Sequence, residues 1–163
     1  MRPGSASRLV RTWLLTAVTD AVFSSVLVTA FYHSTFARLW QGVASTLLGK
    51  GALDGGNRTV AIGLVMHFGV ALFWSVVFLL LYENSERIRS AVASRYGVLK
   101  VASLYGPLIW LVMSLIVIPL LVHRPPNLNF RWLVQLIGHI PFVALPIVWS
   151  IGRDGPGSSR RNS

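Results

Sequence analysis

The chain has 163 residues, of which 53% are hydrophobic and 12% are charged, about half the charged fraction of a typical soluble domain. It contains no cysteine, which excludes disulfides, thiolate metal sites and cysteine nucleophiles. Its formal net charge is +10, but the Lys and Arg residues stand in short segments between apolar runs. We therefore expect an anionic membrane, and not nucleic acid, as the partner of this charge.

Four apolar runs are long enough to cross about 30 Å of hydrocarbon as helices, and they lie at 13–32, 60–82, 101–122 and 132–151. Backbone groups find no water in hydrocarbon, so these runs must be helical. We predict an all-α membrane protein in which four transmembrane helices, at about 9–33, 60–82, 98–122 and 131–151, form an antiparallel bundle.

The bundle is expected to be a single domain over 1–152, followed by a disordered cytoplasmic tail at 153–163 that is rich in Gly, Ser and Arg. The first apolar run could also be a signal peptide, because arginines precede it. It is longer than the usual apolar region of a signal peptide and it holds Asp20, so we expect it to be retained as an anchor.

The first loop contains apolar residues at helical spacing, namely Phe36, Leu39, Trp40, Val43 and Leu47. They predict a short helix at about 36–49 that lies in the outer interface or folds back onto the bundle. Leu39, Trp40, Val43 and Leu47 should then face lipid or the bundle. On the opposite side of this helix, Gln41 and Ser45 should face water.

The distribution of Lys and Arg predicts the orientation. Ten of the fifteen lie in the N-terminal segment, the second loop and the C-terminal segment: Arg2, Arg8, Arg11, Arg87, Arg89, Arg95, Lys100, Arg153, Arg160 and Arg161. The first and third loops hold Arg38, Lys50, Arg58, Arg124 and Arg131. Basic segments stay in the cytoplasm, so both termini should be cytoplasmic. The third loop is short and contains Pro125 and Pro126, which predicts that the last two helices are neighbours.

Each predicted helix has a face of small or polar residues, and such faces should point at one another inside a bundle. In chain order the faces are Thr12, Thr16, Asp20 and Ser24; Gly63, His67, Ala71 and Ser75; Ser103, Gly106 and Ser114; and Gln135, Gly138 and His139. Packing alone explains most of these residues.

Asp20, His67, His139 and Ser114 form a candidate buried polar site, because their positions along the helices place the histidines and Ser114 in one layer, with Asp20 one turn deeper. An acid at the bilayer centre costs about 2.5–3.5 kcal/mol, a cost that hydrogen bonds from a histidine or hydroxyl would lower. A structural role for Asp20 and packing roles for the histidines are the alternatives. The usual zinc signatures are absent and no nucleophile elbow is present, so we predict no metal, cofactor or catalytic residue.

Two segments carry a family resemblance. The first is 39–49, Leu-Trp-Gln-Gly-Val-Ala-Ser-Thr-Leu-Leu-Gly, with Gly55-Gly56 and then 63–68, Gly-Leu-Val-Met-His-Phe; the second is 105–113, continued by 117–120, Val-Ile-Pro-Leu. With Asp20, they resemble a group of small four-helix bacterial inner-membrane proteins of unknown function. Ser114 and Leu121 stand where that group has Asn and Ser. The resemblance implies a bacterial inner membrane, points to Asp20 and His67, and implies no activity.

Two functional hypotheses follow. The first is a structural or accessory inner-membrane protein, with the lipid bilayer and a second copy or another membrane protein as partners. The second is a protein that binds or transports a small solute, an ion or a proton through the buried Asp/His site. An intramembrane enzyme is a third possibility that no motif supports.

Overall fold

The computed structural model describes residues 5–153, which are almost entirely helical and contain no strand. Four helical segments in this part of the chain are long and apolar enough to cross a membrane, namely Ser5–Phe31, Gly56–Asn84, Gly97–Val122 and Phe130–Arg153. The prediction of an all-α protein with four such helices is therefore confirmed. Residues 1–4 and 154–163, which include most of the predicted tail, lie outside the described residues. Arg153, assigned to that tail, instead ends the last helix.

Three of the four long segments contain a π-helical turn. The first is α1 (Ser5–Val26) with η1 (Leu27–Phe31), and the second is the uninterrupted α3 (Gly56–Asn84). The third is α5 (Gly97–Val112), η3 (Met113–Val117) and α6 (Ile118–Val122). The fourth is α7 (Phe130–His139), η4 (Ile140–Ala144) and α8 (Leu145–Arg153). Such turns often mark functional positions; here Ser114 lies in η3 and His139 directly precedes η4.

Short helices occupy two of the loops. The predicted first-loop helix is α2 (Phe36–Leu48); the Thr35 hydroxyl caps it by accepting from the Arg38 backbone N–H at 3.1 Å. A short η2 (Lys50–Asp54) follows it. A further helix, α4 (Glu86–Ala93), was not predicted. Its signal in the sequence is Ser85, whose hydroxyl accepts from the Ile88 N–H.

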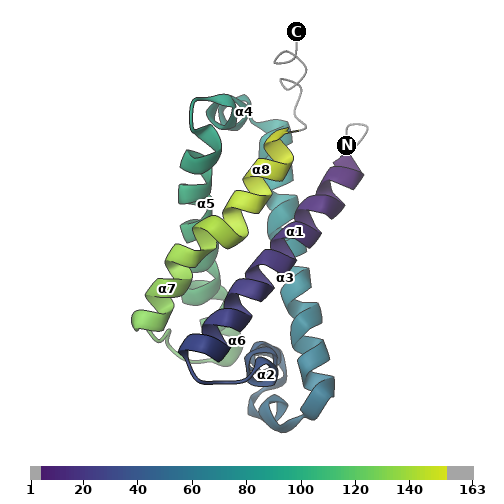
Figure 1. Ribbon diagram of the computed structural model, residues 1–163, viewed down its shortest axis with the longest axis vertical. Coiled ribbons are helices and arrows are strands. Elements are labelled where there is room, and N and C mark those ends of the chain that lie inside the picture. The colour runs from purple at the N-terminus through teal and green to yellow at the C-terminus, as the bar shows by residue number, and fades with distance from the viewer. Residues whose placement is uncertain (1–4, 154–163) are drawn as a thin grey trace.

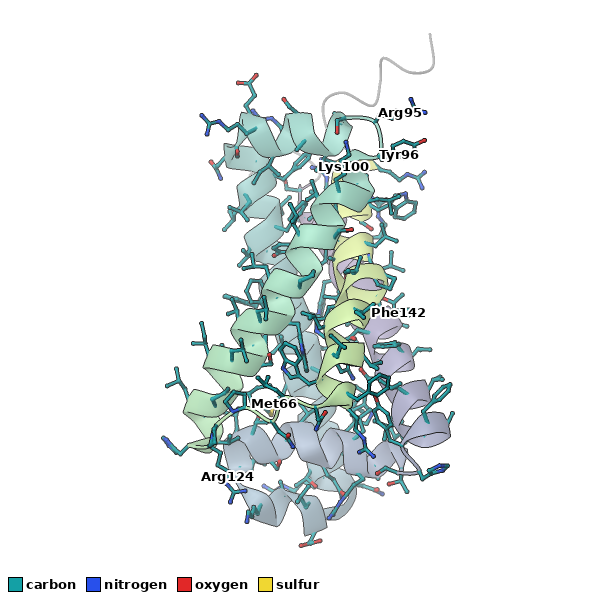
Figure 2. All side chains as sticks on the ribbon, turned by 90° about the vertical axis from the view of Figure 1, so that its left-hand side faces the viewer. Met66, Arg95, Tyr96, Lys100, Arg124 and Phe142 are labelled. Carbon is teal, nitrogen blue, oxygen red and sulfur yellow. The ribbon has the colours of Figure 1, made fainter. Side chains whose placement is uncertain are left out.

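The termini of the described chain lie at one end of the molecule together with α4, and α2 lies at the opposite end (Figure 1). Figure 2 shows α2 running crosswise to the long helices at that end. The first long helix packs on α3, on η4 and on α8, while α5 packs on α7, η4 and α8. The last two long segments are therefore neighbours, as the short third loop predicts.

The apolar core lies between α3, α5 and α8, in the half of the molecule nearer the termini. Its largest buried side chains include Phe78 and Leu79 of α3, Ile109 of α5 and Ile147 of α8. The Tyr105 hydroxyl crosses this core and donates to the Trp74 carbonyl at 2.8 Å. The other half of the molecule has fewer buried apolar residues and holds the candidate polar site.

Thr19 joins α1 to the fourth long segment. Its hydroxyl lies 2.7 Å from the Phe142 carbonyl oxygen, and also 2.8 Å from the Leu15 carbonyl of its own helix. In a regular α-helix the Phe142 carbonyl would accept a hydrogen bond from the backbone N–H of residue 146. Residue 146 is a proline and has no N–H. The proline thus leaves an acceptor that a hydroxyl on the neighbouring helix can satisfy.

Gly63 allows the closest approach between helices in the half that holds the candidate site. A Cβ at this position would lie 2.7 Å from the carbonyl carbon of Trp40 and nearer still to its oxygen. Only a residue without a side chain lets the α2 backbone approach α3 this closely. Trp40 is thereby held against the helix that carries His67.

The predicted polar faces are correct for the first two long helices, where Thr12, Thr16, Ala71 and Ser75 are buried. Two predictions of orientation are wrong. Ser103 is exposed, because Tyr105, Gly106 and Ile109 form the inner face of α5. Gln41 is buried and its side-chain amide donates to the Gly56 carbonyl at 3.4 Å. The approach at Gly63 turns the Trp40–Gln41–Ala44 edge of α2 inward, away from the orientation that its apolar stripe indicates.

Candidate functional site

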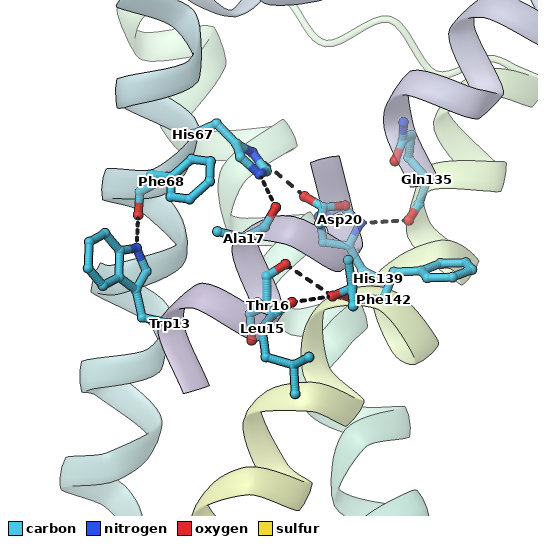
Figure 3. A network of polar contacts seen from close by, with 11 residues as sticks. Trp13, Leu15, Thr16, Ala17, Asp20, His67, Phe68, Gln135, His139 and Phe142 are labelled. Carbon is cyan, nitrogen blue, oxygen red and sulfur yellow. Dashed lines mark hydrogen bonds and ion pairs between the residues drawn. The ribbon is translucent and has the colours of Figure 1, made fainter. Parts of the chain in front are cut away.

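Asp20 of α1 and His67 of α3 face each other inside the protein. The Asp20 Oδ2 atom lies 3.8 Å from Nδ1 of His67, and the two side chains are 17% and 13% exposed (Figure 3). The other ring nitrogen of His67, Nε2, lies 2.9 Å from the carbonyl oxygen of Ala17. Ala17 is one turn before Asp20 on the same face of α1, so a single histidine contacts two successive turns of this helix.

This geometry decides which nitrogen of His67 carries hydrogen. A carbonyl oxygen can only accept, so Nε2 must be the N–H group that donates to Ala17. In a neutral imidazole Nδ1 is then a bare acceptor, and it faces a carboxylate oxygen that is also an acceptor. Two lone pairs facing each other at 3.8 Å repel. A proton on either group removes the repulsion, and a closure of about 1 Å would bring the atoms into a hydrogen bond.

His139 lies beside this pair without being bonded to it. Its Nδ1 is 2.8 Å from the Gln135 carbonyl of its own helix, which makes Nδ1 the N–H group. The ring is buried and interacts electrostatically with both Asp20 and His67. In the described part of the chain, no hydrogen bond or ion pair joins His139 to either residue. Of the four predicted site residues, the structure thus brings Asp20 and His67 to ion-pair distance, with the buried His139 ring as a neighbour.

Trp40 covers His67 from the side of α2. The two ring centroids are 5.0 Å apart in an edge-to-face arrangement, and Trp40 is 1% exposed. The sequence predicted that Trp40 faces lipid or the bundle but did not connect it with the site. The signal that could have done so is Gly63, one turn before His67, where a missing side chain leaves room for another backbone.

Ser114 is the predicted site residue that lies apart from the pair. It is buried on η3 and lines a small cavity with Trp110 and Trp132. Among residues 5–153, no hydrogen bond or ion pair connects it with Asp20 or with a histidine. Trp110 links the cavity beside Ser114 to the neighbourhood of the Asp20–His67 pair, because it lines the cavity and its ring centroid is 4.8 Å from that of His139.

Several buried oxygens of α1 have no hydrogen-bond partner among the described residues. They are Oδ1 of Asp20 and the hydroxyls of Thr12, Thr16 and Ser25. Thr12, Thr16 and Asp20 are four residues apart and share one helix face. This face therefore offers successive hydrogen-bonding groups from the Asp20–His67 pair toward the end of the molecule that holds the termini.

The arrangement suits proton chemistry better than metal binding. No group of three or more His, Asp or Glu side chains within 5–153 is placed to hold a metal ion. One carboxyl and one imidazole at ion-pair distance can share or exchange a proton, and proton relays are one of the roles that such residues have inside membranes. Comparison of the chain with protein-family models, curated proteins and solved structures finds no match.

Proposed function

We propose that this chain is a multi-pass protein of a bacterial inner membrane whose Asp20–His67 pair binds and releases a proton, as the centre of a proton-linked binding or transport protein. The observation that carries the proposal is the position of Nδ1 of His67, 3.8 Å from Asp20 Oδ2 while Nε2 is committed to the Ala17 carbonyl. With one proton the pair is neutral overall. Without it, an anionic carboxylate faces a nitrogen lone pair.

The cost of an acid inside a membrane supports a functional role. An Asp at the centre of a spanning helix costs about 2.5–3.5 kcal/mol, so such residues are rare and usually lie on ion or proton pathways. The buried hydroxyls of Thr16 and Thr12 extend the polar face of α1 away from Asp20. We propose that they form the route by which protons reach the pair from the end that holds the termini.

The proposal includes an antiparallel four-helix bundle, with α2 as an interfacial helix and both termini in the cytoplasm. The support is the charge distribution, with ten of the fifteen basic residues in the terminal segments and second loop. Reporter domains fused at Ser159 and at Gly55 test the orientation. The fusion at Ser159 should be cytoplasmic and the one at Gly55 extracytoplasmic, and the reverse result would exclude this orientation.

Proton transfer is tested in liposomes that contain the purified protein and an internal pH-sensitive dye. A potassium diffusion potential drives protons inward, and the rate of internal acidification is measured. We expect Asp20→Asn to reduce the rate to that of protein-free liposomes. The matched control is Asp54→Asn, because the Asp54 side chain is 89% exposed and its contact with Arg38 is a surface ion pair. Equal rates for wild type and Asp20→Asn would contradict the proposal.

A structural role is the second candidate, and the His67 hydrogen bond to Ala17 favours it because this bond joins α3 to α1. The two roles differ in how mutations combine. If Asp20 and His67 form a pair, His67→Ala should destabilise wild type more than it destabilises Asp20→Asn, by about 0.5–3 kcal/mol of coupling. If His67 acts only through Ala17, the two substitutions should have additive effects on stability, and liposomes with wild-type protein should acidify no faster than those with Asp20→Asn.

A further inference from the structure

Two adjoining hollows lie at the end of the molecule opposite the termini. The inner one has a volume of about 190 Å³ and lies between the third and fourth long segments, where Trp110, Ser114 and Trp132 line it. The outer one, of about 420 Å³, is a shallow groove on the surface of η3 and α6. Pro119, Arg124 and Pro125 line both, so the two hollows adjoin each other.

The inner hollow contains donors that the described protein does not use. Ser114 is 7% exposed, and neither its hydroxyl nor the indole N–H groups of Trp110 and Trp132 have a partner within 5–153. The Ser75 hydroxyl on α3, by contrast, donates to the Ala71 carbonyl of its own helix at 2.8 Å. Unpaired buried donors are costly, and these three belong to residues that line one hollow, so a ligand there that supplies acceptors would satisfy them.

Arg124 makes the rim of both hollows positive. Figure 2 shows it at the end of the molecule opposite Arg95 and Lys100. In the described part of the chain Arg124 has no acidic partner, whereas nearby Arg131 lies over the ring of Tyr32 at 4.3 Å. A guanidinium beside unpaired hydrogen-bond donors fits a phosphate group.

The outer groove is apolar apart from this rim. Leu115, Ile116 and Leu120 line it and are exposed, with no segment of the described chain covering them. An amphiphile fits the two hollows together, because its charged head would meet Arg124 while its apolar chain lies on the groove. A soluble anion would leave the groove without an occupant.

We propose that the two hollows form a binding site for an anionic phospholipid. Its phosphate contacts Arg124, its ester carbonyls accept from Ser114, Trp110 and Trp132, and an acyl chain lies along Leu115, Ile116 and Leu120. The site does not depend on the Asp20–His67 pair, since it uses none of the atoms of that pair. Its position beside Trp110, which contacts His139, would let a bound lipid influence the polar site.

The test is lipid titration of the delipidated protein in detergent, followed by native mass spectrometry. Phosphatidylglycerol and phosphatidylcholine with identical acyl chains are compared, together with glycerol phosphate as the soluble anion. We expect phosphatidylglycerol to bind most tightly and glycerol phosphate not to bind. Arg124→Gln should weaken phosphatidylglycerol about fivefold, the usual effect of one basic residue near anionic lipid. Ser114→Ala should weaken it about twofold or more through loss of one hydrogen bond.

Arg58→Gln is the matched control, because Arg58 is an exposed arginine in the first loop region, at the start of α3. It should leave phosphatidylglycerol affinity unchanged. The proposal is overturned if the two lipids bind equally, if Arg124→Gln has no effect, or if Arg58→Gln weakens binding as much. Binding of glycerol phosphate as tight as that of phosphatidylglycerol would identify a site for soluble anions instead. None of these results depends on proton transfer by Asp20.

Discussion

Replacing Gly63 with Ala should separate α2 from α3 and loosen the cover over His67. The added Cβ would lie 2.7 Å from the Trp40 carbonyl carbon, whereas ordinary contact between carbon atoms is about 3.5–4.0 Å. Because the Trp40 carbonyl oxygen would lie nearer still, the α2 backbone must retreat by at least about 1 Å. A backbone cannot turn aside as a flexible side chain can, so we expect a cost of about 1–3 kcal/mol, typical of overpacking.

Gly69→Ala is the control on the same helix. Nothing lies within 4 Å of a Cβ built there, so the substitution should be neutral or should stabilise the helix by up to about 1 kcal/mol. Both variants can be compared by reversible unfolding in SDS, followed by the fluorescence of the six tryptophans. The Gly63→Ala variant should unfold at a lower SDS concentration than the Gly69→Ala variant.

The same variant tests the site itself. Because the Trp40 and His67 rings are 5.0 Å apart, a shift of α2 should change the ring-current shifts of the His67 protons. The exposed His33 should not respond. If Gly63→Ala and Gly69→Ala unfold at the same SDS concentration, or if the His67 signals are unchanged, the docking of α2 on α3 described above is wrong.

Two further predictions concern packing. Thr19→Val should lower stability by about 0.6–1.7 kcal/mol, because it removes the hydroxyl that bonds the Phe142 carbonyl. Thr29→Val should cost less, since the Thr29 hydroxyl bonds only its own helix. SDS unfolding compares the two variants, and equal losses of stability would count against the interhelical bond. A cysteine in place of buried Gln41 should react slowly with a water-soluble maleimide, whereas a cysteine in place of exposed Lys50 should react rapidly. Rapid labelling at both positions would show that residue 41 faces water, as the apolar stripe of α2 indicates.

The sequence predicted the number of long helices and their approximate limits because length and apolar composition decide both. It also indicated that Asp20 needs a polar partner inside the protein, with His67, His139 or a hydroxyl as the alternatives, but it did not decide among them. It did not predict the orientation of α2. The apolar stripe of an interfacial helix indicates which side avoids water, but the backbone contact at Gly63 determines which side is buried.

The polar residues of the third and fourth helices were harder to place. Ser103 and Ser114 are both serines in an apolar helix, yet one is exposed and the other is buried. Regular α-helix joins the two positions as far as Val112, and eleven residues are about three turns, so helical spacing places both serines on nearly the same face and does not distinguish them. His139 was predicted to face the interior and does, but its N–H bonds its own helix and not Asp20.

The most direct test of the account is ¹⁵N NMR of the His67 ring in wild type and in Asp20→Asn. We predict that Nε2 carries hydrogen in both proteins, because it donates to the Ala17 carbonyl, and that the Nδ1 chemical shift changes on substitution, because Nδ1 faces the Asp20 carboxyl. The signals of exposed His33 serve as the internal reference. A bare Nε2 in the wild-type protein, or an Nδ1 signal that is identical in the two proteins, would contradict a proton held between Asp20 and His67.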